Sequence, residues 1–471
     1  MGSVCDTASE VVDYLNAKGE KVGVLSIHLY RPFSIKHFLR ALPKSVKKVA
    51  VLDRTKEAGS LGDPLYLEIQ SALYNSDIRP TIIGGRYGLG GKDVTPDQIF
   101  AVYNELTKEH PQNGFTIGIR DDVSFTSLPE FSEDIDLTPE GTTACKFWGL
   151  GSDGTVGANK SAVKIIGDKT DMYAQAYFAY DSKKSGGITM SHLRFGKKPI
   201  RSPYLINKAN FISCSQQSYV DKYNLLAGLK QNGTFLLNTL WSDEELSEKL
   251  PAYMKRYIAA NNINFYTVNA VKIAQELGLG GRFNMVMQSA FFKLANIIPI
   301  DEAVKYLKDA VVTSYGKKGQ NIVDMNNGAI DKGIEALHKV EVPASWKDAV
   351  DEEVHDTDVP DFIRNIQNPM NRQEGDELPV SAFRNREDGT FPVGTSAYEK
   401  RGIAINVPEW DIDKCIQCNQ CSFVCPHAAI RPVLMTDEEA ANAPAGMKYK
   451  PALGAKGLQF AITISAKACE G

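Results

Sequence analysis

The most constraining stretch is a run of four cysteines, Cys415, Cys418, Cys421 and Cys425, followed directly by Pro426. In the spacing C-x2-C-x2-C-x3-C-P, the first three thiolates can close around one face of a cubane [4Fe–4S] cluster. Thiolates also bind zinc. A structural zinc site, however, usually pairs two C-x2-C knuckles or one knuckle with histidines. The spacing therefore favours an iron–sulfur cluster over zinc.

The same run predicts a second cluster, because its fourth cysteine ligates the other cluster of a two-cluster module. One later cysteine, Cys469, stands just before the last two residues, where a second C-x2-C would begin. We therefore expect the chain to be cut within that second motif, leaving five of the eight cysteines that two clusters need. The predicted metal ligands are Cys415, Cys418, Cys421, Cys425 and Cys469. We expect the chain to be cut at its start as well, since residues 1–5 pass directly into a helical pattern.

Composition excludes several classes of protein. The chain has 471 residues, enough for about three domains, and a net charge of −4 that points to neither nucleic acid nor a membrane surface. It has no signal-peptide pattern and no apolar run long enough to span a membrane. We expect Cys5, Cys145 and Cys214 to be buried in a reducing cytosol, so the predicted location is cytoplasmic.

The first 130 residues alternate strands and helices. Strands are expected at 22–27, 48–52 and 81–83, and helices at 34–42, 67–74 and 96–109. This alternation predicts a parallel, doubly wound sheet. The loops after the strands, 53–56 and 84–91 among them, lie where such sheets bind ligands. Packing of these loops against another domain is at least as good an interpretation.

A second α/β unit follows a linker at 128–142. A strand from 145 runs into the glycines Gly149, Gly151 and Gly154 and then into a helix that continues through residue 166. Glycines let the backbone approach a phosphate, and a helix N-terminus supplies free N–H groups and a positive dipole. A tight turn that binds nothing remains the alternative.

A second glycine-rich loop, residues 181–187, lies between strands expected at 173–180 and 188–195. It carries Lys183 and Lys184, and the strand after it carries His192 and Arg194. Together they predict an anion-binding surface, although a solvated basic loop is also plausible. Further strands are expected at 211–214, 234–238 and 264–268, and helices at 243–250 and 270–277. A long apolar helix that ends near 294 opens with Arg282, Asn284 and Gln288, which either cap it or face a ligand.

From about 346 to 407 prolines and acidic residues recur and periodicity fades. We expect an extended connector that wraps other domains and leads to the cysteine run.

With these residues in place, the chain resembles the pyruvate:ferredoxin (flavodoxin) oxidoreductases. The glycine-rich loops, the motif Tyr398-Glu399-Lys400-Arg401 and the cysteine run carry the resemblance. It implies an α/β multidomain fold: a transketolase C-terminal-like parallel sheet (1–130), a Rossmann-like γ-type domain (140–345), an EKR-type connector (346–407) and an incomplete α+β two-cluster ferredoxin-like domain (408–471).

The resemblance also implies a reaction, the oxidative decarboxylation of pyruvate with coenzyme A to acetyl-CoA and CO2. Thiamine diphosphate and Mg2+ carry the chemistry, and electrons pass through [4Fe–4S] clusters to ferredoxin or flavodoxin. The family is usually homodimeric. No thiamine diphosphate motif occurs in this chain, so we expect the middle part of the enzyme, without catalytic residues of its own. Another 2-oxoacid in place of pyruvate remains open.

The resemblance places coenzyme A in the γ-type domain. The contacts it implies are Ser152, Asp153, Gly154 and Thr155 at the helix start, Lys183 and Lys184 for phosphate charge, and Arg282, Asn284 and Gln288 for ribose phosphate or adenine. Two alternatives stay open: a non-catalytic electron-transfer or scaffold protein, and a hybrid reductase that reuses these domains.

Overall fold

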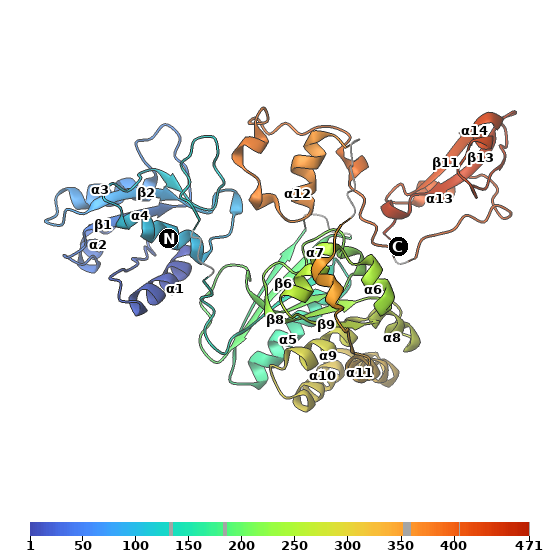
Figure 1. The fold of residues 1–471 in the computed structure, drawn as a ribbon, viewed down its shortest axis with the longest axis horizontal. Helices are drawn as coiled ribbons and strands as arrows, with labels where there is room; N and C mark the ends of the chain where they lie inside the picture. The colour runs from blue at the N-terminus through green and yellow to red at the C-terminus, as the bar shows by residue number, and fades with distance from the viewer. Residues whose placement is uncertain (131–134, 182–185, 352–358, 405, 471) are drawn as a thin grey trace.

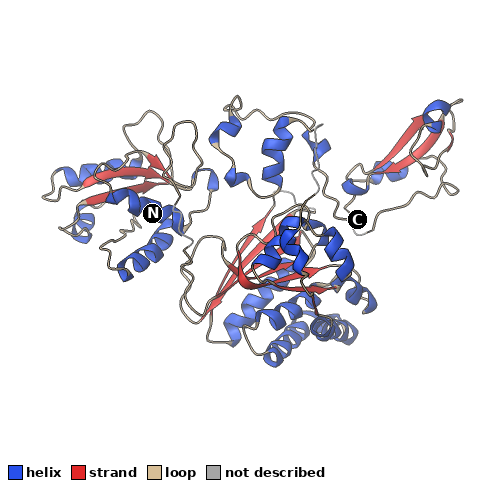
Figure 2. Cartoon of the chain, viewed as in Figure 1, coloured by secondary structure: helices blue, strands red, loops and turns tan. Residues whose placement is uncertain are grey.

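The computed structural model describes residues 1–130, 135–181, 186–351, 359–404 and 406–470. Figure 1 shows four parts, which we call the N-terminal unit (residues 1–128), the central unit (142–346), the connector (361–403) and the C-terminal unit (408–470). The central unit contains the largest sheet, and the C-terminal unit projects away from the other three parts (Figures 1 and 2). No helix in the described ranges is long and apolar enough to cross a membrane.

The N-terminal unit is built on a three-stranded parallel sheet of order β1-β2-β3. Its strands are β1 (Lys48–Asp53), β2 (Thr81–Arg86) and β3 (Phe115–Thr116), and its helices are α1 (Val4–Ala17), α2 (Ile35–Ala41), α3 (Pro64–Tyr74) and α4 (Pro96–Thr107). One core contains Val11, Ile99 and Phe115, and another contains Val51 and Ile69. The parallel sheet agrees with the alternation in the sequence.

The prediction of a strand at residues 22–27 is wrong. These residues form no ladder with β1, β2 or β3. Leu25 and Ile27 are only partly buried, beside the core that α2 and α3 share, and Val24 is 40% exposed. The apolar alternation is therefore satisfied by packing against helices rather than by strand pairing, which periodicity alone does not distinguish.

The central unit has a seven-stranded sheet of order β10-β9-β8-β7-β4-β6-β5. Its strands are β4 (Thr143–Leu150), β5 (Tyr173–Tyr180), β6 (Ile188–Gly196), β7 (Ala209–Cys214), β8 (Leu229–Asn238), β9 (Asn264–Val268) and β10 (His338–Lys339). β4, β7, β8 and β9 run parallel to one another, whereas β6 is antiparallel to both β4 and β5, and β10 is antiparallel to β9. The carboxyl ends of the four parallel strands therefore meet at one edge of the sheet.

Helices cover both faces of this sheet. They are α5 (Thr155–Lys169), α6 (Asp243–Lys249), α7 (Ala252–Ala260), α8 (Ala270–Glu276), α9 (Asn284–Ala295), α10 (Ile300–Tyr315) and α11 (Gln320–Glu335). The core under α5 and α9 contains Phe147, Phe211 and Phe291, whose rings contact one another. The opposite core, with Trp148 and Phe235, includes residues of α6 and α7.

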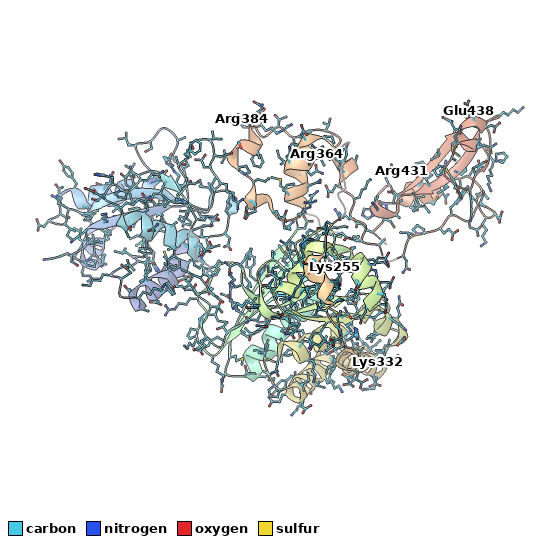
Figure 3. The ribbon with its side chains drawn as sticks, in the orientation of Figure 1. Lys255, Lys332, Arg364, Arg384, Arg431 and Glu438 are labelled. Atoms are coloured by element: carbon cyan, nitrogen blue, oxygen red, sulfur yellow. The ribbon has the colours of Figure 1, made fainter. Side chains whose placement is uncertain are left out.

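The connector contains short helical turns and the helix α12 (Asn368–Asn371). The C-terminal unit has a three-stranded antiparallel sheet of order β11-β13-β12. Its elements are α13 (Gln420–Val424), β11 (Ile430–Met435), α14 (Asp437–Ala441), β12 (Lys450–Pro451) and β13 (Gln459–Ile464). Its buried core is small, with Met435, Ala440 and Ala461 at its centre. Figure 3 labels Arg364 and Arg384 on the connector and Arg431 and Glu438 on the C-terminal unit.

Candidate coenzyme A and iron–sulfur sites

The glycine-rich loop after β4 is shaped by Asp153. One carboxylate oxygen, Oδ1, accepts from the Thr155 amide at 2.7 Å. The other, Oδ2, accepts from the Leu150 amide at 2.8 Å and from the Thr155 hydroxyl at 2.8 Å. The loop passes through left-handed backbone at Ser152 (φ 74°) and Gly154 (φ 88°), which is the N-cap of α5. Asp153 and the Thr155 hydroxyl thus maintain the loop, while Ser152 and Gly154 are exposed.

Two polar residues that we did not single out from the sequence support this loop. Ser215, which follows β7, donates from Oγ to Asp153 Oδ2 at 2.9 Å. Asn238, at the end of β8, donates to the Ser215 carbonyl at 3.0 Å and accepts from the Ala270 amide at 3.0 Å. Both stand at carboxyl ends of parallel strands beside β4, which is the position where such sheets place functional side chains. That rule, applied to 211–214 and 234–238, would have found them.

The start of α9 lies against the same loop. A Cβ on Gly154 would stand 3.2 Å from Asn284 Cγ, and Asn284 is the first residue of α9. Two helix N-termini, those of α5 and α9, therefore meet at the glycine loop. Each contributes a positive dipole end and N–H groups without intrahelical partners. Within the described ranges, Arg282 and Asn284 have no side-chain hydrogen bond or ion pair, so both are available to a ligand.

Gln288 lies one turn further along α9 and is 4% exposed. Its Nε2 donates to the Ala158 carbonyl on α5 at 3.0 Å. This hydrogen bond therefore joins α9 to α5 close to the point where their N-termini meet. The predicted contact of Gln288 with a ligand stays a prediction.

The second glycine-rich loop is joined to the first, because the Gly151 amide donates to the Gly187 carbonyl at 2.7 Å. Lys183 and Lys184 lie outside the described residues, so their predicted phosphate contacts stay predictions. Beneath this junction the Thr189 hydroxyl is buried and has no hydrogen-bond partner in the described part of the chain. It would stand 2.8 Å from a Cβ on Gly149, which explains why the first glycine of the loop has no side chain.

The prediction that His192 and Arg194 belong to an anion-binding surface is wrong. Their side chains are 5% and 6% exposed and are covered by the segment that links β6 to β7. His192 Nδ1 accepts from the Ile206 amide at 3.0 Å, and Arg194 Nη2 donates to the Tyr204 carbonyl at 2.9 Å. The two side chains share one face of β6, and β6 is covered on both faces, so both are buried. Burial lowers the pKa of His192 to about 3, helped by nearby Lys146 and Arg194.

The cysteine run has the donor chemistry for an iron–sulfur cluster. Backbone amides of Gln417 and Ala429 donate to the sulfurs of Cys415 and Cys425, at 3.4 and 3.3 Å. Backbone N–H groups, that of Ile430 foremost, lower the pKa of the Cys425 thiol. Such N–H···S bonds stabilise the thiolate that binds iron. The residues present fit the group.

Within the described residues, no three metal-binding side chains converge on one point as a single ion requires. A cubane cluster separates its four thiolates more widely than a zinc ion does. Cys418 and Cys421 are exposed on and beside α13, and Cys415, Cys425 and Cys469 are half-buried.

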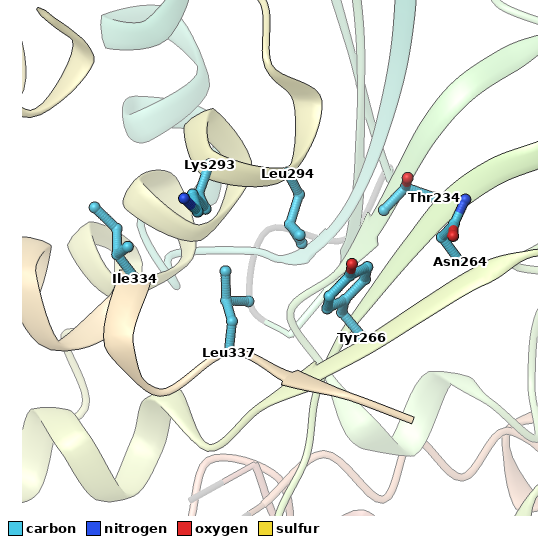
Figure 4. A pocket seen from close by; sticks show the side chains of 7 residues that line it. All are labelled: Thr234, Asn264, Tyr266, Lys293, Leu294, Ile334 and Leu337. Carbon is cyan, nitrogen blue, oxygen red and sulfur yellow. The ribbon is translucent and has the colours of Figure 1, made fainter. Parts of the chain in front are cut away.

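Two cavities lie away from the glycine loop. One, of about 370 Å3, is at the opposite end of α9, where Lys293 and Leu294 face Tyr266 of β9 (Figure 4). The other, of about 260 Å3, separates the N-terminal and central units and is lined by Arg54, Gly88 and Tyr177. Residues of the loops after β1 and β2 line this cavity, so ligand binding and packing against another unit both stay open as interpretations.

Sequence comparisons cover most of the chain. Residues 144–336 match the family "Pyruvate ferredoxin/flavodoxin oxidoreductase", and residues 1–99 match "Pyruvate:ferredoxin oxidoreductase core domain II". Residues 407–430 match a 4Fe-4S binding domain, and residues 349–404 match a family described as a domain of unknown function.

Curated relatives match over the whole chain. The pyruvate-flavodoxin oxidoreductase of Enterobacter agglomerans is 68% identical, and the pyruvate:ferredoxin oxidoreductase of Moorella thermoacetica is 57% identical. Each match covers 100% of this chain and 40% of the relative. Among solved structures, the pyruvate oxidoreductase subunit PORC of Thermotoga maritima covers 43% of this chain and 100% of its own, with 18% identity and a TM-score of 0.35.

Two matching families are parts of one enzyme, and together they cover more than half of the chain. The relatives agree with them, and this chain spans about 40% of their length. Over its whole length, this chain is similar to part of the pyruvate ferredoxin/flavodoxin oxidoreductases.

Proposed function

We propose that this chain binds coenzyme A and relays electrons as part of an enzyme that oxidatively decarboxylates pyruvate to acetyl-CoA and CO2. Ferredoxin or flavodoxin takes the electrons, and the names of the curated relatives support both acceptors. In this proposal, other parts of the enzyme hold thiamine diphosphate and Mg2+, and the whole enzyme is a cytoplasmic homodimer. The N-terminal unit acts as the transketolase C-terminal-like domain and the central unit as the γ-type domain.

The convergence of the N-termini of α5 and α9 at Gly154 carries the coenzyme A proposal. A phosphate placed there meets N–H groups of Val156 and Gly157 and two helix dipoles of the same sign. Arg282, which is exposed beside the start of α9, adds a full positive charge. The Asp153 carboxylate holds the loop, and its predicted contact with coenzyme A stays a prediction.

The cysteine run holds [4Fe–4S] clusters, which supply one-electron carriers of low potential. The residues that hold them are Cys415, Cys418, Cys421, Cys425 and Cys469. The chain's own contribution is to orient these sulfurs and to donate backbone N–H groups to them, which stabilises the thiolate form.

Calorimetric titration of the 471-residue chain with coenzyme A tests the binding proposal. We expect saturable binding that weakens at least about tenfold in Arg282→Ala and Asn284→Ala, the effect of losing one charge-assisted hydrogen bond. Lys293→Ala is the matched control, because it removes a lysine at the other end of the same helix. Absence of binding by a folded chain, or equal loss in the control, would contradict the proposal.

A further inference from the structure

The C-terminal unit is attached to the rest of the chain at its base. Figure 1 shows its sheet projecting outward from the connector. At the base, in the part of the chain that the structure describes, the Gly402 amide donates to the Lys467 carbonyl at 2.8 Å. Next to it, Arg401 Nη1 lies 2.7 Å from Glu470 Oε1. The connector residues 401 and 402 therefore hold the unit near its last described residues.

Glu470 makes a second side-chain contact, this one within the C-terminal unit. Its Oε2 lies 3.1 Å from His427 Nε2. His427 is two residues after Cys425, and Glu470 directly follows Cys469. One carboxylate therefore joins the chain segments of two predicted cluster ligands that are far apart in sequence, and Arg401 binds the same carboxylate from outside.

The connector is itself fixed to the central unit. Ile403 is 5% exposed and belongs to the core that contains Trp148 and Ile188. Its carbonyl accepts from Gln216 Nε2 at 3.2 Å. Arg401 also lies against the second glycine-rich loop, since a Cβ on Gly186 would stand 3.0 Å from its Nη1. Arg401 thus lies between Ile403, which is packed in the core of the central unit, and the C-terminal unit.

The Arg401–Glu470 ion pair is more buried than the Lys448–Glu409 ion pair of the C-terminal unit. The side chains of Arg401 and Glu470 are 26% and 12% exposed. Those of Lys448 and Glu409 are 54% and 87% exposed. Exposed ion pairs contribute little, whereas a partly buried charge-assisted bond holds its partners in one geometry. We therefore expect the Arg401–Glu470 contact to hold the C-terminal unit in place.

We propose that Arg401 is a positioning residue for electron transfer. Through Glu470 it fixes the C-terminal unit against the central unit, so that the cluster keeps one distance and orientation relative to the rest of the enzyme. This assigns a role to a segment that matches only a domain of unknown function. The electron-transfer part of the inference rests on the proposed function, whereas the holding role does not.

Hydrogen exchange measured by mass spectrometry tests the holding role on the 471-residue chain, with and without reconstituted iron and sulfide. In Arg401→Gln we expect about tenfold faster exchange at residues 427–435 and 459–470, the effect of losing one charge-assisted bond. Exchange in β4 and β7 should not change. Arg401→Lys should restore part of the protection, and Lys448→Gln, the matched control, should resemble the parent. Unchanged exchange in Arg401→Gln overturns the proposal.

A second measurement separates this proposal from the proposed function. In the full-length enzyme, Arg401→Gln should leave the affinity for coenzyme A and the cluster content unchanged. Reduction of the clusters by pyruvate, followed by freeze-quench electron paramagnetic resonance, should slow by about tenfold, and Arg401→Lys should recover part of the rate. An unchanged rate beside faster exchange overturns the positioning role. If the parent chain binds no coenzyme A, the proposed function is contradicted. The hydrogen-exchange measurement still decides whether Arg401 holds the C-terminal unit in place.

Discussion

The Gln288 side chain donates a hydrogen bond to the Ala158 carbonyl at 3.0 Å, joining α9 to α5 from within the core. Gln288 is 4% exposed, so the bond is shielded from water. The two helices begin at the same place, the glycine-rich loop after β4. The alignment of their N-termini therefore depends on a buried residue rather than on any group that faces the ligand.

Gln288→Leu tests this alignment. Leucine keeps most of the volume and removes the bond, so we expect a loss of about 1 kcal/mol in the free energy of unfolding, measured by urea titration. Coenzyme A should bind more weakly, because α5 and α9 can then shift apart. Gln275→Leu, at an exposed position of α8, should change stability by less than about 0.5 kcal/mol. Equal effects of the two substitutions would show that the bond has no special role.

Asp153→Asn tests whether the carboxylate shapes the loop. An amide cannot accept on both sides, so its NH2 group would face N–H donors of Leu150 or Thr155. We expect a loss of about 2 kcal/mol in unfolding free energy, and coenzyme A affinity at least about tenfold lower. Asp168→Asn replaces an exposed carboxylate at the far end of α5 and should change neither quantity. A stable Asp153→Asn variant with normal binding would refute this role.

His192 predicts a particular sensitivity to acid. Burial, together with Lys146 and Arg194, lowers its pKa in the folded state to about 3, from 6.5. Between these pH values the unfolded chain binds a proton that the folded chain excludes. Its contribution to stability is therefore complete above pH 6.5 and is lost progressively as the pH falls toward 3, by about 1.4 kcal/mol per pH unit.

The variant His192→Asn isolates this contribution, because its Oδ1 can still accept from the Ile206 amide while its side chain does not titrate. Urea unfolding at a series of pH values should show a shallower loss of stability below pH 6.5 than in the parent chain. His110→Asn, which replaces an exposed histidine, should follow the parent. Parallel curves for His192→Asn and the parent would contradict the assignment.

Iron removal should affect the C-terminal unit selectively. Its core centres on Met435, Ala440 and Ala461, too little apolar burial to stabilise a unit of this size strongly, so metal binding should contribute to its folding. We expect hydrogen exchange at 408–470 to accelerate after removal of the clusters while β7 and β8 stay protected. Cys418→Ser should reproduce the effect, and Cys5→Ser should not. Uniform protection before and after removal would show that the unit folds without its clusters.

Local patterns in the sequence were enough to predict most elements of the central unit. The strand at 143–150, the turn with Gly154 and the helix after it follow from apolar alternation, from glycine at a left-handed position and from helical periodicity. The spacing of the cysteine run likewise indicates its chemistry, because Cys415, Cys418 and Cys421 are close enough in sequence to bind the same cluster whatever the rest of the fold.

Other features depended on which segments the fold brings together. Ser215 reaches the glycine loop because β7 lies beside β4 in the sheet, and Asn238 supports Ser215 because β8 lies beside β7. His192 and Arg194 have residue types typical of a binding surface, yet strand parity and a covering segment place them inside. Sequence alone determined the local chemistry and the periodicity. The tertiary structure decided partners and exposure, because these depend on strand order and on long-range packing that no local pattern encodes.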